Sequence, residues 1–252
     1  MIDVRDHGDV RELRLNRPPA NALSPELLER LCAHVVSAPS EGARALVISG
    51  AGGMFTGGLD VPLLLRLDRA GMMAAWATFH GAMQTLATAA VPVVAAITGH
   101  SPGGGLVLAL FCDHRVQARG AFKIGLNEVA VGIPLPRVIF AALRRQVGPR
   151  VAEELAVTGA LLDPDAALKV GLVDELAPAE EVVDRAVAWC RQLLGAPPHA
   201  MRETRTMARA DLAALFAGLD AAAIAAELDR CWYAGEAQQT LAALVRRLTE
   251  RR

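Results

Sequence analysis

The chain has 252 residues, a formal net charge of −1, and 53% hydrophobic against 21% charged residues. That length suits one large domain or a domain with an appendage. The near-neutral charge, with no basic stripe along any predicted face, argues against nucleic acid as a partner. The arginine-rich end predicts the solvated face of a helix, and its members are Arg246, Arg247, Arg251 and Arg252.

The four cysteines are widely separated, and none lies in a C-x-x-C motif or near a histidine at metal-ligand spacing. They predict small buried side chains in a reducing compartment and no metal site. The N-terminal sequence MIDVRDHGDV lacks the apolar core of a signal peptide, and no apolar run is long enough to span a bilayer. We therefore expect a cytoplasmic protein with no membrane partner.

The first part of the chain predicts strands that alternate with helices and a glycine-rich loop. Residues 10–16 (VRELRLN) alternate between polar and apolar side chains and predict a strand. An N-cap serine followed by proline predicts a helix over residues 24–36 (SPELLERLCAHVV). Residues 44–50 (RALVISG) form a short apolar run typical of a buried parallel strand, and residues 51–60 (AGGMFTGGLD) predict a loop.

The middle of the chain repeats this order. Residues 91–99 (VPVVAAITG) predict a second buried strand, which leads through the loop GHSPGGG into a buried helix over residues 106–112 (LVLALFC). Further short strands are expected at residues 113–118 (DHRVQA) and 171–178 (GLVDELAP). The alternation favours an α/β core with a mostly parallel sheet.

The last part of the chain carries helical patterns and no strand signal. We predict an α/β core over residues 1–196 and a helical region over residues 197–252 that caps the core or joins subunits, with APPH (196–199) as a hinge. One amphipathic face of this region must bury against the core or against another subunit. Its apolar members are Leu212, Leu215, Phe216 and Leu219.

Two glycine-rich loops follow consecutive buried strands, at AGGMFTGGLD and GHSPGGG. Loops at the ends of parallel strands are where α/β proteins place ligands. Glycine allows close approach of the backbone, and exposed N–H groups at a helix start attract negative charge. One N–H from each loop would form a two-donor oxyanion hole, whereas the alternative is a pair of tight turns.

A dinucleotide-binding loop is a competing interpretation, because residues 98–105 match the pattern T-G-x-x-x-G-x-G of short-chain dehydrogenases. Three features argue against it. The loop does not follow the first strand. The next strand ends in VQARG, which offers no acidic residue to a ribose. The Y-x-x-x-K motif is missing, because the position four residues after Tyr233 is Ala237.

Four motifs in order resemble those of the enoyl-CoA hydratase/isomerase (crotonase) superfamily, and they span roughly residues 5–195. The matching segments are NRPPANAL, SGAGGMFTGGLD, PVVAAITGHSPGGGLVLALFCDHRV and AALKVGLVDELAP. The resemblance implies a spiral of ββα units capped by C-terminal helices, a homotrimer or dimer of trimers, and an acyl-CoA thioester as substrate. It implies no separate cofactor, since coenzyme A is part of the substrate.

The resemblance also assigns roles to individual positions. The oxyanion donors fall on the backbone N–H groups of Leu59 and Gly104. The hydratases carry a glutamate where this chain has Val107, while their second glutamate corresponds to Glu128 in IGLNE. The stretch IGLNE, followed by the pattern G-I-x-x-P, resembles the mitochondrial-type Δ3,Δ2-enoyl-CoA isomerases, which keep only this second glutamate. Substrate contacts are implied at Ala20, Ala22, Leu23, Thr56, Gly58, Asp60, Gly103 and Leu126.

Glu128 is the predicted acid and base, and its apolar surroundings are expected to raise its pKa by desolvation. Those surroundings are Ile124, Leu126, Val129 and Val131. The alternative for Glu128 is a structural ion pair with Lys123 or Arg137. Other polar side chains are expected to have structural roles. We predict that His100 binds backbone, that His80 takes part in packing, that Asp60 caps a helix, and that Asp113 pairs with Arg115.

The sequence therefore predicts a Δ3,Δ2-enoyl-CoA isomerase, with residues 59–76 lining the acyl tunnel. Two alternatives stay open. One is another acyl-CoA enolate chemistry, such as hydration, decarboxylation or thioester hydrolysis, and the other is an acyl-CoA-binding subunit without turnover.

Overall fold

The structure, a computed structural model, describes the backbone of residues 1–250 and the side chains of residues 1–246. Within these residues, six strands form the central sheet in the order β1-β2-β3-β4-β6-β8. They are β1 (Ile2–His7), β2 (Val10–Leu15), β3 (Ala45–Gly50), β4 (Val93–Ile97), β6 (His114–Ala118) and β8 (Glu175–Ala177). All neighbours from β2 to β8 are parallel, which confirms the prediction of a mostly parallel sheet.

The antiparallel edge strand β1 was not predicted. It pairs with β2 through a tight turn at Gly8, where φ is +72°. Its sequence IDVRDH is charged and lies mostly at the surface, so it carries little of the apolar pattern that marks a strand. A charged, exposed edge also discourages pairing with other chains.

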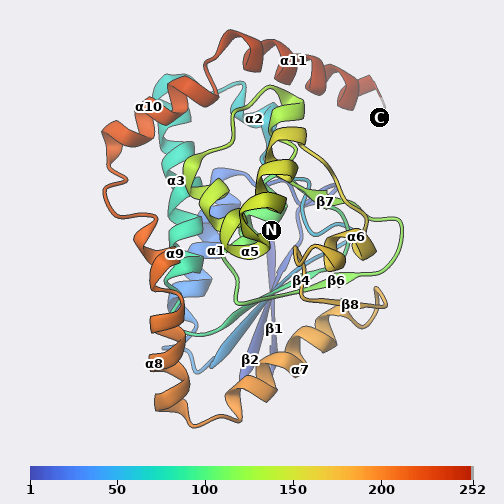
Figure 1. The fold of residues 1–252 in the computed structure, drawn as a ribbon, viewed down its shortest axis with the longest axis vertical. Coiled ribbons are helices and arrows are strands. Elements are labelled where there is room, and N and C mark those ends of the chain that lie inside the picture. Colours follow the sequence, from blue (N-terminus) through green and yellow to red (C-terminus); the bar gives the residue numbers. More distant parts are fainter. Residues whose placement is uncertain (251–252) are drawn as a thin grey trace.

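The sheet is buried on both faces, because side chains alternate along each strand. In β3, Leu46 and Ile48 face one apolar cluster, while Ala45 and Val47 face another. Helix α7 (Val182–Leu194) covers the second face (Figure 1). The first face is covered by α1 (Pro25–Ser37), α3 (Arg69–Ala87), α4 (Gly104–Leu110) and α5 (Arg137–Thr158). The remaining helices of the core are α2 (Val61–Leu64) and α6 (Pro164–Lys169).

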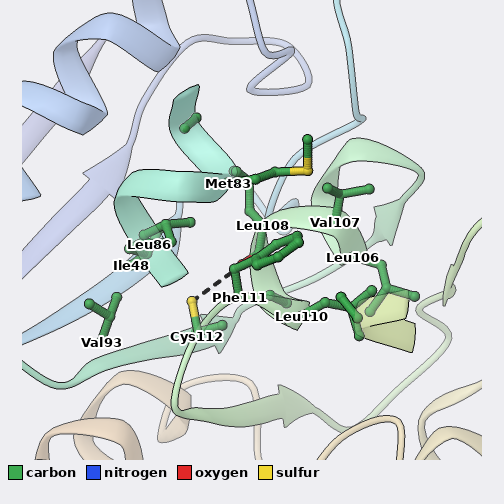
Figure 2. Close-up of a cluster of buried hydrophobic side chains, with 14 of the residues drawn as sticks. Ile48, Met83, Leu86, Val93, Leu106, Val107, Leu108, Leu110, Phe111 and Cys112 are labelled. Atoms are coloured by element: carbon green, nitrogen blue, oxygen red, sulfur yellow. Dashed lines mark hydrogen bonds between the residues drawn. The ribbon is translucent and has the colours of Figure 1, made fainter. Parts of the chain in front are cut away.

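Helix α4 is buried along its whole length, as the sequence predicts for residues 106–112. Figure 2 shows Val107, Leu108 and Phe111 within the apolar cluster that α4 forms with α3 and the sheet. Val107 is 0% exposed. The helix begins at Gly104, so its first, unpaired N–H groups are held in place by this packing.

Four helices follow α7 within the described residues, and none of that part of the chain is a strand. They are α8 (Pro198–Ala208), α9 (Ala210–Ala214), α10 (Ala221–Cys231) and α11 (Gly235–Glu250). They run along one side of the molecule and then across its top (Figure 1). The predicted apolar face is confirmed, since Leu212 and Phe216 are buried in the core of the same chain. Arg246 is exposed, whereas Arg251, Arg252 and the side chain of Arg247 lie outside the described residues.

Buried arginines attach α8 and α9 to the core. The guanidinium of Arg209 donates to the backbone oxygens of Phe111 at 2.7 Å and Leu86 at 3.1 Å. Asp113 accepts from Arg205 at 2.7 Å and also pairs with Arg209 at 3.3 Å. The ion pairs between Asp113 and these two arginines thus lie where the C-terminal helices meet the ends of α3 and α4.

The predicted pair between Asp113 and Arg115 is wrong. Arg115 instead binds Asp174 at 2.7 Å. Asp113 precedes β6, accepts the backbone N–H of Val93, and turns toward the arginines of α8 and α9. Proximity along the chain suggested the wrong partner because the true partners come from distant segments.

Replacing Arg209 with methionine is expected to lower the free energy of unfolding by about 2–4 kcal/mol, because Asp113 and four backbone carbonyls lose a buried donor. Urea denaturation measures the change. The matched control is Arg145→Met, which breaks an exposed pair with Asp211 of α9 and should cost under about 1 kcal/mol. Equal losses for the two variants would contradict the assignment of Arg209 as the buried anchor.

Candidate active site

Short backbone bridges bring the predicted site loops together. Leu23 pairs with Leu59, with Leu23 N–H donating to Gly58 at 2.8 Å and Asp60 N–H donating to Leu23 at 3.1 Å. A second, two-stranded sheet pairs β5 (Ser101–Pro102) with β7 (Ile124–Gly125). The loops after β2, β3, β4 and β6 thus meet beside the N-terminus of α4.

The backbone around Gly58 approaches the start of α4 very closely. Gly58 has a φ of +86°, and its N–H donates to the Thr56 hydroxyl at 3.1 Å. A Cβ atom added to Gly58 would lie 3.3 Å from the nitrogen of Gly104, and one added to Gly104 would lie 3.3 Å from the nitrogen of Leu59. The two predicted donor nitrogens therefore face one narrow space that a side chain at either glycine would fill.

The N–H groups of Leu59 and Gly104 have no acceptor in the part of the chain that the structure describes. An unpaired N–H in a protein interior is costly unless a ligand or water accepts from it. Gly104 also opens α4, where the helix dipole favours negative charge. The geometry suits an oxygen atom that gains negative charge.

Glu128 is held next to this space by its own backbone. The Gly103 N–H donates to Gly125 at 2.8 Å, which joins the loop before α4 to the segment that leads to Glu128. A Cβ atom added to Gly103 would lie 3.6 Å from Oε1 of Glu128. The Glu128 carbonyl accepts from Ile133 at 2.9 Å, so the main chain is fixed while the carboxyl group stays free.

One oxygen of the Glu128 carboxyl group is buried without a partner. Its Oε2 atom is inaccessible and unbonded, and burial raises its pKa to about 7. Among the described residues, neither Lys123 nor Arg137 forms an ion pair with it. The predicted rise in pKa is confirmed, and the structural ion pair is not formed.

The predicted apolar surroundings of Glu128 are only partly correct. Ile124 and Leu126 are buried at 0% and 3% exposure. Val129 is 46% exposed, because it begins the short 3-10 helix η1 (Val129–Val131), where the chain turns outward. Burial of Glu128 therefore comes from the residues that precede it and from the glycine loop.

The residues predicted to contact substrate gather on the same loops. Thr56, Gly58 and Leu23 lie around the donor space. Gly103 lies beside the Glu128 carboxyl group, and Leu126 comes two residues before Glu128. The Ala20 carbonyl accepts from Gly57 at 2.7 Å, and the Ala22 carbonyl accepts from Arg17 at 3.0 Å. Their contacts with a substrate stay predictions.

Asp60 is the predicted helix cap, and this role is confirmed. Its carboxylate accepts the N–H of Leu63 at 3.1 Å at the start of α2 and pairs with Arg17 at 2.6 Å. With both oxygens occupied, Asp60 fixes the loop in which Leu59 lies. Arg17 had no predicted role.

Two further side chains tie these loops in place. Asn21 is 2% exposed with a φ of +51°, and its amide donates to the carbonyls of Ala51 and Met54 at 3.0 Å each. The motif N-A-L contains this residue, but the pattern gave no reason for an asparagine there. His100 accepts the Lys123 N–H at 3.1 Å, as predicted for a loop histidine bonded to backbone.

A small apolar cavity of about 10 Å³ adjoins Leu59. Five of its lining residues belong to the predicted tunnel segment 59–76: Leu59, Leu64, Met72, Ala75 and Trp76. The others are Leu23, Pro25, Leu28 and Phe79. A cavity of this size has room for about one water-sized probe, so an apolar chain could enter only if the lining side chains moved.

Within the described residues, no three or more histidine, cysteine, aspartate or glutamate side chains are grouped to hold a metal ion. Among the described helices, none combines the length and apolar character that crossing a membrane requires.

Glu128→Gln is expected to change how stability depends on pH. Between pH 4.5 and about 7 the unfolded chain releases this proton while the folded chain retains it. The stabilising contribution of the Glu128 proton to the free energy of unfolding is therefore fully present below pH 4.5 and is lost as pH rises through 7. Relative to the unaltered protein, the variant should gain about 3 kcal/mol of unfolding free energy between pH 4 and pH 8.

Urea denaturation across this pH range measures the difference, and the exposed Glu153→Gln serves as control. If both variants kept a constant offset from the unaltered protein, the assignment of a buried neutral carboxyl to Glu128 would be wrong.

Comparisons with known proteins agree with the motifs. The family model described as enoyl-CoA hydratase/isomerase matches residues 5–227. A probable enoyl-CoA hydratase, EchA17, of Mycobacterium tuberculosis is 34% identical over 233 residues, which cover 90% of this chain and 86% of that protein. The human mitochondrial enoyl-CoA delta isomerase 1 is 32% identical over 212 residues, covering 83% and 70%.

The fold is also shared. The crystal structure of human mitochondrial Δ3-Δ2-enoyl-CoA isomerase superposes with a TM-score of 0.93 at 29% identity, covering 100% of this chain and 99% of that one. The predicted α/β crotonase-like fold is confirmed. With its motifs, its fold and these relatives in agreement, the chain belongs to the enoyl-CoA hydratase/isomerase family.

Proposed function

We propose that this protein is a Δ3,Δ2-enoyl-CoA isomerase, which moves the double bond of a 3-enoyl-CoA into conjugation with the thioester. One observation carries the proposal: the carboxyl group of Glu128, with one buried and unbonded oxygen, lies beside the loop that presents two free N–H groups. A pKa of about 7 suits a group that must both accept and return a proton near neutral pH.

The reaction begins when the Glu128 carboxylate removes a proton from C2 of the substrate. The electrons of the broken C–H bond spread over C2, C4 and the thioester oxygen of a dienolate. The N–H groups of Leu59 and Gly104 stabilise the charge on that oxygen, a contribution of about 2.7–4 kcal/mol for each such donor. The Glu128 carboxylic acid then delivers the proton to C4, which leaves a C2–C3 double bond.

The apolar side chain of Val107 supports isomerisation over hydration. In the two-glutamate hydratases that the motifs resemble, a carboxylate at this position helps to hold the attacking water. Val107, on α4, is 0% exposed, and its side chain lies in the apolar cluster drawn in Figure 2, where it offers water no acceptor. A double-bond shift needs no water, and one carboxyl group suffices because C2 and C4 lie on the same face of the substrate.

In the proposed complex, the acyl-CoA thioester is the substrate and no separate cofactor takes part. The thioester oxygen binds between Leu59 and Gly104, and the acyl chain extends toward the cavity at Trp76. The homotrimer or dimer of trimers and the cytoplasmic location stay predictions from the sequence.

Glu128→Gln is expected to reduce isomerisation by about 10²–10⁴-fold or more, because glutamine cannot accept the C2 proton. The assay supplies purified protein with 3-enoyl-CoA and follows the absorbance of the conjugated thioester. Binding of a saturated acyl-CoA should stay within about threefold of the unaltered protein, since both oxyanion donors remain.

Two other results would replace the proposal. Addition of water to 2-enoyl-CoA, faster than double-bond movement in 3-enoyl-CoA, would favour a hydratase, as the name of the mycobacterial relative suggests. Tight binding of acyl-CoA with neither reaction would identify a non-catalytic binding subunit.

The pH dependence of isomerisation supplies an independent prediction. Only ionised Glu128 can take the C2 proton, so kcat/KM should rise about tenfold per pH unit below pH 7 and level off above it. Steady-state rates between pH 5 and pH 9 test this. A rate that is constant below pH 7 would exclude Glu128 as the base.

A further inference from the structure

A second buried carboxylate, Glu227, lies on α10 where this helix packs against α3. Glu227 is 8% exposed. Its Oε1 atom accepts from Nε2 of His80 at 2.8 Å and from Nε1 of Trp76 at 3.2 Å. Arg230 is 3.9 Å from the other oxygen. An ionised carboxylate only accepts hydrogen bonds, so the His80 proton sits on Nε2.

This arrangement is costly for a carboxylate that serves packing alone. Glu227 borders the apolar cluster that joins α10 to α2 and α3, whose members include Met72, Leu228 and Trp232. Replacing buried ionic groups by apolar side chains often leaves a protein equally or more stable. Stability alone therefore does not account for a carboxylate at this position, and the side chains that Glu227 binds indicate its role.

Trp76 connects Glu227 to the candidate active site. Its side chain lines the cavity of about 10 Å³ that also touches Leu23 and Leu59, and Leu59 carries one of the two oxyanion donors. The indole has one polar atom, Nε1, and within the described residues its hydrogen bond goes to Glu227. The Trp76 ring is thus tied to a carboxylate from the C-terminal helices, beside its ring contacts with Phe79 and Trp232.

We propose that Glu227 is a positioning residue that holds Trp76 as the end wall of the acyl pocket and so limits the length of acyl chain that the pocket accepts. The inference rests on the proposed function in one respect, that an acyl chain occupies this cavity. With the indole fixed, the space beside Trp76 is only about 10 Å³, which is room for about one water-sized probe, so the acyl chain must end short of the ring. With the indole released, Trp76 can turn away and admit further methylene groups.

The test compares four variants in the full chain. Glu227→Leu removes the acceptor, Trp76→Phe removes the donor, and the double variant combines them. Asp229→Asn is the matched control, because Asp229 joins the same two helices through an exposed pair with Arg69 at 2.7 Å. Calorimetry measures the Kd of saturated acyl-CoA esters with chains of four to fourteen carbons, and thermal unfolding reports on stability.

For the unaltered protein, the affinity for acyl-CoA should rise with chain length only among the short chains. Beyond the length at which the chain reaches Trp76, it should stay constant. Each extra buried methylene strengthens binding by about fourfold. Glu227→Leu should move the levelling point by two or more carbons, which improves long-chain over short-chain affinity by about tenfold or more. Trp76→Phe should act in the same direction, the double variant should add little to either, and Asp229→Asn should leave the profile unchanged.

A purely structural role predicts different results. The inference is overturned if Glu227→Leu weakens all chain lengths equally, if it changes nothing, or if its effect persists in the Trp76→Phe background. Should Glu227→Leu fail to fold, Glu227→Gln replaces it, since the amide keeps the shape but is a weaker acceptor. The shift is then expected in the same direction and smaller.

The two proposals fail separately. If the protein isomerises 3-enoyl-CoA but the Glu227 variants keep the chain-length profile, the inference is wrong and the proposed function stands. If the profile shifts as expected but no isomerisation occurs, the inference stands and the isomerase proposal is wrong. Absence of acyl-CoA binding in the unaltered protein would overturn both.

Discussion

The pairing of β5 with β7 is the constraint on which the candidate site depends. Each strand has two residues, and the contact between them continues as the hydrogen bond from Gly103 to Gly125. This pairing joins the loop that starts α4 to the segment that carries Glu128. Without it, the free N–H of Gly104 and the carboxyl group of Glu128 would belong to separate parts of the surface.

The site gathers polar groups that the fold leaves unsatisfied. The Leu59 and Gly104 N–H groups and the Oε2 atom of Glu128 have no partners among the described residues, and each such group costs free energy. The surrounding chain holds them in place through a fully buried α4 and through Asp60 and Asn21, whose side chains are both bonded. Stability elsewhere thus maintains a strained but preorganised arrangement.

The sequence predicted what has a local signal and missed what depends on distant contacts. The buried strands β3 and β4, the start of α1 and the glycine loops follow from apolar runs and from capping and turn residues. Two-residue strands such as β5 and β7 have no periodicity to detect, and the charged edge strand β1 lacks an apolar run. The bond between Trp76 and Glu227 joins residues 151 positions apart, so no spacing rule reveals it.

A single carboxyl group has a further physical consequence for the chemistry. Two carboxylates that share a site repel one another, so that their titrations are coupled and neither has a pKa of its own. Here, the motif resemblance matches Val107 to the position of the hydratases' other glutamate, and burial raises the pKa of Glu128 to about 7. Glu128 is then expected to titrate as one independent group. The proposed double-bond shift needs one group that acts first as a base toward C2 and then as an acid toward C4, and an uncoupled carboxyl group with a pKa of about 7 is available in both forms near neutral pH.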